Sequence, residues 1–168
     1  MRATWGVLSF VICMTLCACG GGGGGGDDCV TPSSGTSMTG AESALGAQVL
    51  VLVNQERMDR SLSTLSWHGE LAQVAFEHSW DMSNRGFFSH TNPCGEEPSQ
   101  RVDKAGISWS VVAENIARGP ATAMEVMVGW MDSSGHRANI LDSRMTHCAI
   151  GVYQSGGETW WTMVLIRQ

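Results

Sequence analysis

The sequence predicts an α+β domain in which helices cover a small antiparallel sheet. Two helical patterns, at about 42–58 and 70–84, carry apolar residues at spacings of three and four. Three later segments run apolar or alternate in the way strands do. The expected strands are residues 109–117, 146–154 and 158–166, the last two joined as a hairpin by Ser155-Gly156-Gly157. The length favours one folded domain over residues 41–168.

The first forty residues are expected to lie outside that domain. Residues 7–16 are an apolar run too short to span a bilayer, and Leu16-Cys17-Ala18-Cys19 resembles a bacterial lipoprotein cleavage signal. We therefore expect residues 1–19 to be a lipoprotein signal peptide with Cys19 as the lipidated residue. Residues 20–40, which begin with an unbroken glycine run, are expected to be a flexible linker. A plain secretory signal cut nearby is the alternative.

Both alternatives predict export. Gly20, in place of Asp, directly after Cys19 resembles lipoproteins of the outer membrane. We expect a lipid-anchored monomer of the cell envelope, favouring the outer membrane, or otherwise a periplasmic or secreted protein. The net charge of −6, without basic clusters, argues against nucleic acid and anionic lipid surfaces as partners.

The helical patterns also predict which side chains are buried. In the first helix, the expected core stripe is Leu45, Val49, Leu52 and Val53, and the expected exposed residues are Gln48, Gln55, Glu56 and Arg57. The second helix is apolar around most of its surface, so His78 is expected to be a buried hydrogen-bonding residue, and Gly86 should end the helix. A short helical segment is expected at 100–104.

A further helix is expected from Thr122 to Met131. Thr122 and Glu125 have the spacing of a capping box, in which each side chain bonds the other residue's backbone amide. The run Ser133-Ser134-Gly135 should then halt the helix.

Three stretches carry residues suited to chemistry. His90 follows an aromatic pair on a turn, Glu114-Asn115 interrupts an apolar strand, and His136 follows the break after Met131. A buried carboxylate is costly without partners, and two histidines with one carboxylate would suit zinc binding or acid–base chemistry. The ordinary alternative is that each histidine makes a structural hydrogen bond and Glu114 pairs with Arg137.

These stretches, in their residues and in their order, closely resemble the motifs of the CAP (SCP-like) family, in its short bacterial branch. The matching motifs are Phe87-Phe88-Ser89-His90, Ala113-Glu114-Asn115-Ile116-Ala117, and residues 130–141 around His136. The resemblance runs from about Leu50 to the C-terminus. It implies a three-layer α-β-α sandwich and a cavity with two histidines and two acidic residues.

The resemblance also implies site residues. His90, Glu114 and His136 match three cavity positions, the fourth acid falls at Ser133, and Asn115 lies beside Glu114. Larger members are reported to bind divalent metal through the two histidines, and some bind lipids, so His90 and His136 are the candidate metal ligands. No single enzyme activity is shared across the family.

The cysteines allow two interpretations. An exported chain favours a disulfide, and Cys94 with Cys148 is the expected pair, which leaves Cys29 unpaired in the linker. The alternative is a zinc site of His90, Cys94, His147 and Cys148. Adjacent strand residues point to opposite faces, which disfavours the joint use of His147 and Cys148.

The function favoured by these observations is a cell-envelope binding module whose cavity holds a divalent metal such as Zn²⁺, or a small ligand such as a lipid or cell-wall component. One alternative is a metal-dependent hydrolase or peptidase with Glu114 as base. Another is a structural or stress protein without a ligand. The sequence has no His-Glu-x-x-His or Gly-x-Ser-x-Gly motif, and Ser89 beside His90 is not expected to form a triad, so an enzyme is disfavoured.

Overall fold

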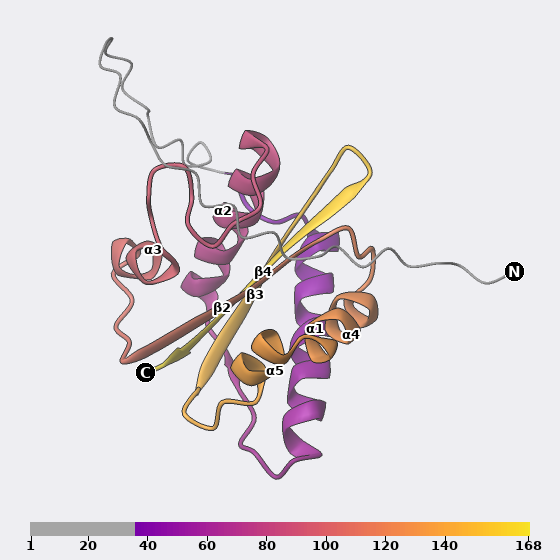
Figure 1. The fold of residues 1–168 in the computed structure, drawn as a ribbon, viewed down its shortest axis with the longest axis vertical. Helices are drawn as coiled ribbons and strands as arrows, with labels where there is room; N and C mark the ends of the chain where they lie inside the picture. Colours follow the sequence, from indigo (N-terminus) through magenta and orange to yellow (C-terminus); the bar gives the residue numbers. More distant parts are fainter. Residues whose placement is uncertain (1–35) are drawn as a thin grey trace, which may run out of the picture.

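The computed structural model describes residues 36–168. Its elements, in chain order, are α1 (Gly40–Met58), β1 (Ser66–Trp67), α2 (Gly69–Arg85), α3 (Pro98–Lys104), β2 (Val111–Arg118), α4 (Ala123–Asp132), α5 (Ser134–Ile140), β3 (His147–Ser155) and β4 (Glu158–Arg167) (Figure 1). The expectations for the signal peptide, for Cys19 and for the glycine run concern residues outside this range. None of the described helices is long and apolar enough to cross a bilayer.

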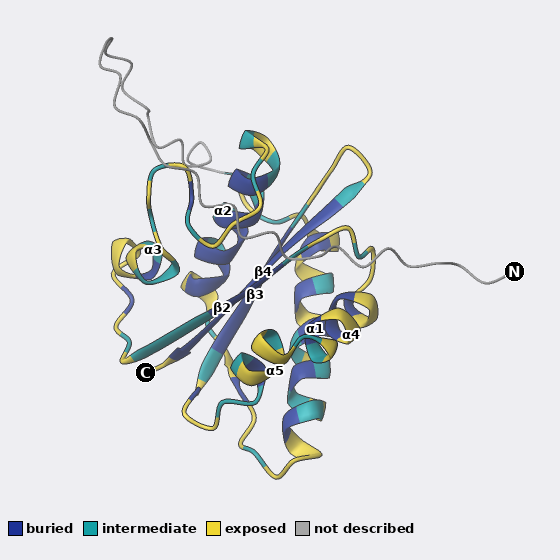
Figure 2. Cartoon of the chain, viewed as in Figure 1, coloured by how far each residue is buried: buried dark blue, intermediate teal, exposed yellow. Residues whose placement is uncertain are grey.

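Helices cover both faces of a four-stranded sheet in the order β1-β3-β4-β2. α1, α4 and α5 pack on one face, against alternate strand residues such as Trp161, Met163 and Leu165. α2 and α3 pack on the other face, against Val164 and Ile166. Figure 2 shows most of β3 and β4 buried, part of β2 at intermediate burial, and the outer sides of the helices exposed. The expected three-layer α-β-α sandwich is therefore confirmed.

The sheet is mixed rather than wholly antiparallel. β2, β3 and β4 are antiparallel neighbours, but β1 pairs in parallel with β3 through Ser66 and Trp67. β1 was not expected from the sequence, because two residues are too few for strand alternation to be visible.

The helix ends follow the local signals in the sequence, with one exception. Thr122 caps α4: its hydroxyl accepts from the Glu125 amide at 3.2 Å, and the Glu125 carboxylate accepts from the Thr122 amide at 3.1 Å. Gly86 ends α2 in the left-handed conformation, with φ of 69°. The expected halt after Met131 is wrong in part, because only Ser133 is extended and α5 begins at Ser134. His136 consequently lies on a second short helix.

The expectation that Arg57 is exposed is wrong. Its side chain is completely buried. The guanidinium donates to the backbone carbonyls of Ser63 at 2.8 Å, Ile140 at 2.6 Å and Asp142 at 3.0 Å. These carbonyls satisfy the buried donors, and the interaction fastens the end of α1 to the end of α5.

α2 lies unusually close to β3 at Gly151. A Cβ atom added to Gly151 would lie 2.0 Å from the backbone nitrogen of Phe76, which leaves no room for a side chain. The Ser79 hydroxyl donates to the Gly151 carbonyl at 3.0 Å across the same contact. This close approach sets the position of His78 relative to the sheet.

The expected Cys94–Cys148 disulfide is wrong. Cys148 is a free thiol, fully buried among the residues that pack against α1 and α4, and burial raises its pKa to about 12. Cys94 lies on the other side of the sheet, in the loop before α3, where its sulfur accepts a hydrogen bond from Arg85 at 3.5 Å. The sheet itself therefore separates the two sulfur atoms.

The alternative zinc site fails for a related reason. The ring of His147 packs edge-to-face against that of His68, with 5.9 Å between centroids, and so lies away from Cys148. Within residues 36–168, no group of three or more His, Cys, Asp or Glu side chains is placed to hold a metal ion.

Candidate functional site

The candidate site is built around the carboxylate of Glu114 on β2, an edge strand of the sheet. Glu114 is 6% exposed. One oxygen accepts from Nδ1 of His90 at 2.8 Å, and the other accepts from the Arg101 guanidinium at 2.7 Å. Nε2 of the buried His78 lies 3.8 Å from the first oxygen. A carboxylate from β2 thus meets side chains from α2, α3 and the loop between them.

These contacts keep Glu114 ionised. Burial opposes ionisation, but the His90 hydrogen bond and the Arg101 charge outweigh it, so the pKa of Glu114 is below its usual value. Burial lowers the pKa of His78 to about 4, so this histidine is neutral near pH 7. An ionised carboxylate only accepts hydrogen bonds, so Nδ1 of His90 is the donor. In the neutral His90 ring, Nε2 then carries a free lone pair.

The partner of Glu114 is Arg101 and not Arg137. Arg137 is exposed and donates to the backbone carbonyl of Met131 at 2.8 Å. Arg101 belongs to the short helix that the sequence analysis expected, but it received no role there. A buried glutamate needs a cation nearby, and Arg101 is one of the cations in the sequence that could serve. Its separation from Glu114 along the chain, however, does not single it out.

The backbone on both sides of His90 is held in place. The Arg101 guanidinium donates to the His90 carbonyl at 2.8 Å, and Nε2 of His78 donates to the Ser89 carbonyl at 3.0 Å. The Ser89 hydroxyl accepts from the Thr91 amide at 3.2 Å. His78 is confirmed as a buried hydrogen-bonding residue.

Asn115 supports His136 from the opposite face of β2. Its side-chain amide is completely buried and donates to the backbone carbonyl of His136 at 3.1 Å. Asn139 donates to the Asn115 side chain at 2.9 Å and to the Glu114 carbonyl at 3.2 Å. Asn115 therefore fixes α5 on the edge of the sheet and does not share the Glu114 cluster.

His136 is half-buried on α5. Burial lowers its pKa, and the charge of His90 lowers it further. Both effects favour the neutral form of the His136 ring. Ser133, where the resemblance would put a second acid, is the extended residue between α4 and α5.

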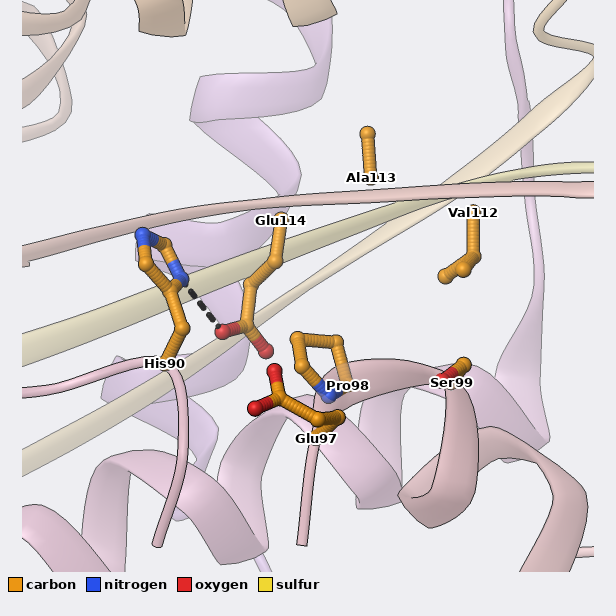
Figure 3. A pocket seen from close by; sticks show the side chains of 7 residues that line it. All are labelled: His90, Glu97, Pro98, Ser99, Val112, Ala113 and Glu114. Atoms are coloured by element: carbon orange, nitrogen blue, oxygen red, sulfur yellow. Dashed lines mark hydrogen bonds and ion pairs between the residues drawn. The ribbon is translucent and has the colours of Figure 1, made fainter.

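A pocket of about 420 Å³ opens beside His90 (Figure 3). It is lined by His90, Glu97, Pro98, Ser99, Val112, Ala113 and Glu114. Glu97, which was not expected from the sequence, directly precedes α3 and brings a second carboxylate to the pocket from the side facing β2. The Thr91 hydroxyl donates to that carboxylate at 2.5 Å. The pocket therefore combines one histidine with two carboxylates, of which Glu114 is already neutralised by Arg101.

The side chains fit a metal ion only in part. Both oxygens of Glu114 already accept hydrogen bonds, from His90 and from Arg101, so a metal ion would compete with these partners for the carboxylate. It instead orients His90, as carboxylates do behind metal-binding histidines. An ion at this site would be held by Nε2 of His90 and by His136.

Known proteins resemble this chain in both sequence and fold. The YkwD protein of Bacillus subtilis is 37% identical over 131 residues, which cover 78% of this chain and 50% of YkwD. The crystal structure of an extracellular SCP-domain protein from Bacillus anthracis is 29% identical, with a TM-score of 0.72, over 79% of this chain and 45% of that one. An outer surface protein of Borrelia burgdorferi shares the fold at 19% identity, with a TM-score of 0.68, over 79% of this chain and 98% of that one.

The chain spans half the length of YkwD and less than half that of the Bacillus anthracis protein, so these similarities concern only part of each of those proteins. Residues 50–165 match the cysteine-rich secretory protein (CAP) family. This segment contains the second half of α1, all elements from β1 through β3, and most of β4. On this match and on the fold, the chain belongs to the CAP family.

Proposed function

We propose that this protein is an exported binding module of the bacterial cell envelope, anchored by lipid at Cys19, which binds a small ligand through His90 at the pocket and through His136 on α5. The observation that carries the proposal is the 2.8 Å hydrogen bond between Nδ1 of His90 and the buried carboxylate of Glu114. It fixes which ring nitrogen is free. The His90 side chain is 46% exposed although its carboxylate partner is 1% exposed, so the fixed ring faces solvent and can meet a ligand.

Export is supported by two observations. Residues 16–19 resemble a lipoprotein cleavage signal, and the related Bacillus anthracis structure is of a protein described as extracellular. Cys19→Ser should release the protein from membranes after export. A Cys19→Ser protein that is exported and still sediments with membranes would remove the lipid anchor from the proposal.

A divalent cation such as Zn²⁺ is the simplest ligand for two neutral imidazoles. Two protein ligands leave coordination positions open, so binding should be weaker than at a closed four-ligand site. Protonation competes with the metal for imidazole nitrogen, so the affinity should fall as the pH drops through the usual histidine range of about 6.5.

Calorimetric titration with ZnCl₂ at pH 7.5 and pH 5.5 tests whether the protein binds Zn²⁺. His90→Ala and His136→Ala should each abolish most of the binding, whereas His147→Ala, whose ring packs against His68 on β1's side of the sheet, should not. Equal binding by all three variants, or no uptake by the wild type, would reject the metal. The ¹⁵N chemical shifts of the His90 ring separately test the hydrogen bond from Nδ1 to Glu114. A neutral ring protonated at Nε2 would contradict that hydrogen bond.

A further inference from the structure

We propose that the pocket binds an extended, amine-bearing peptide, which adds as a short strand to the N-terminal half of β2. The inference rests on the proposed function only in that the same pocket is the ligand site. The proposed ligand would bind both to the backbone of β2 and to the charged groups of the pocket.

The backbone groups of alternate β2 residues point away from the sheet. β2 is bonded to β4 on one side only. The Gly119 amide donates to the Thr159 carbonyl at 2.9 Å, and these two residues continue the β2–β4 register. In an antiparallel pair, hydrogen-bonded and non-hydrogen-bonded positions alternate, so the odd-numbered residues of β2 bond to β4. The backbone groups of Val112, Glu114 and Ile116 therefore face outward.

Helices α4 and α5 cover only the C-terminal half of this edge. The indole of Trp130 donates to the Ile116 carbonyl at 3.3 Å, and Asn139 donates to the Glu114 carbonyl at 3.2 Å. Toward the start of the strand, Val112 is half-buried and lines the pocket together with Ala113 and Glu114. Val112 and Glu114, whose backbone groups face outward, thus both line the pocket, and their outward groups have the spacing with which an added strand would pair.

The side chains at the pocket favour a donor that carries positive charge. Nε2 of His90 accepts a hydrogen bond when the ring is neutral, and the carboxylate of Glu97 adds a negative charge. The one cation in the described cluster around Glu114, Arg101, already neutralises that carboxylate. The chain as a whole carries a net charge of −6. An amine, on a lysine-type side chain or a peptide N-terminus, complements these groups, whereas a carboxylate or phosphate would be repelled.

The size and the remaining walls agree with a peptide side chain. A volume of about 420 Å³ lies at the small end of the range of ligand pockets. Pro98, Val112 and Ala113 supply apolar contact for the methylene part of such a side chain, which can bury its stem while its amine reaches a carboxylate.

Calorimetry on the full chain with blocked peptides tests the proposal. Acetyl-Ala-Lys-Ala-amide should bind, and the same peptide with its lysine replaced by norleucine or its backbone amides N-methylated should bind at least about fivefold more weakly, because each loses hydrogen bonds or charge contacts. Val112→Pro removes the outward amide, and proline is tolerated at such edge positions. Glu97→Gln removes the charge. Both variants should weaken the lysine peptide by about tenfold, and Glu56→Gln, which changes the same charge on α1, should not.

The ligand variants keep the test valid if Val112→Pro does not fold. Equal affinity for the lysine and norleucine peptides, or for the normal and N-methylated peptides, would overturn the proposal, as would no binding at millimolar concentration. If zinc binds through His90 and His136 but the peptide does not, this inference fails and the proposed function stands. If the peptide binds as described and zinc does not, the inference stands and the metal is not the occupant.

Discussion

Arg101→Met is expected to destabilise the domain strongly, because it leaves the carboxylate of Glu114 buried without its cation. The side chains of the pair are 9% and 1% exposed, so water cannot replace the guanidinium. Breaking a buried ion pair by removing one partner costs about 3–5 kcal/mol. Methionine keeps much of the apolar volume of the arginine stem, so the loss reports on charge and hydrogen bonds more than on packing. The contacts from Arg101 to the His90 and Glu96 carbonyls, at 2.8 Å each, are lost as well.

A double-mutant cycle isolates the pair. Glu114→Gln in the Arg101→Met background removes the charge that had lost its partner, so the double variant should be less destabilised than the sum of the two single variants, by about 1–3 kcal/mol. Urea denaturation at pH 7, followed by tryptophan fluorescence and far-UV circular dichroism, supplies the free energies of unfolding. Arg60→Met is the matched control. Arg60 forms an exposed pair with Glu56, with side chains 45% and 34% exposed, and such pairs contribute about 1 kcal/mol or less.

Two results would refute this reasoning. One is a loss for Arg101→Met that is no larger than the loss for Arg60→Met, since the two arginines differ chiefly in the burial of their partners. The other is strict additivity of Arg101→Met and Glu114→Gln, because two groups joined at 2.7 Å in a buried site must be coupled.

Three further predictions follow from buried positions. His78, with a native pKa of about 4 against about 6.5 when unfolded, stays neutral in the fold; the unfolded chain therefore binds more protons as the pH falls from 6.5 to 4, and stability should drop by up to about 3 kcal/mol across that window. His78→Gln, which keeps a donor for the Ser89 carbonyl, should flatten this part of the pH profile of urea midpoints. Gly151→Ala should prevent folding or lower the melting temperature sharply, whereas Gly129→Ala, with nothing within 4 Å of the new Cβ inside α4, should raise stability by about 0.5–1 kcal/mol in the same melts. Cys148 should resist iodoacetamide until denaturant is added, and rapid alkylation of the native protein would contradict its burial.

The features that the sequence predicted well depend on residues that lie within one or two helical turns of each other along the chain. The capping box of Thr122 and Glu125 and the left-handed Gly86 depend only on near neighbours in the chain. The burial of His78 followed from the apolar face around it. The hairpin of β3 and β4 followed from turn residues between two apolar runs. Local signals of this kind fix the layers of the sandwich, because each element then has one face to bury.

The features that the sequence did not reveal depend on partners far along the chain. Arg57 on a helix next to polar residues has the sequence appearance of a surface side chain, but two of its carbonyl acceptors lie 83 and 85 residues away. Arg101 lies 13 residues from Glu114, and nothing in its own segment distinguishes it from Arg137. Cys148 was expected to pair because the compartment favours disulfides, but the face of β3 on which its side chain lies decided the outcome.

The Glu114-Asn115 dipeptide explains why the site forms at an edge of the sheet. Neighbouring strand residues point to opposite faces, so Glu114 meets His90 on the side of α2 and α3, and Asn115 holds the backbone of His136 on the side of α5. On an interior strand, the sheet would keep these two groups apart. β2 has no neighbour beyond it among the described strands, so no further strand separates the groups held on its two faces, and the charge of His90 contributes to the lowered pKa of His136. The same alternation excludes a cavity into which both Glu114 and Asn115 point.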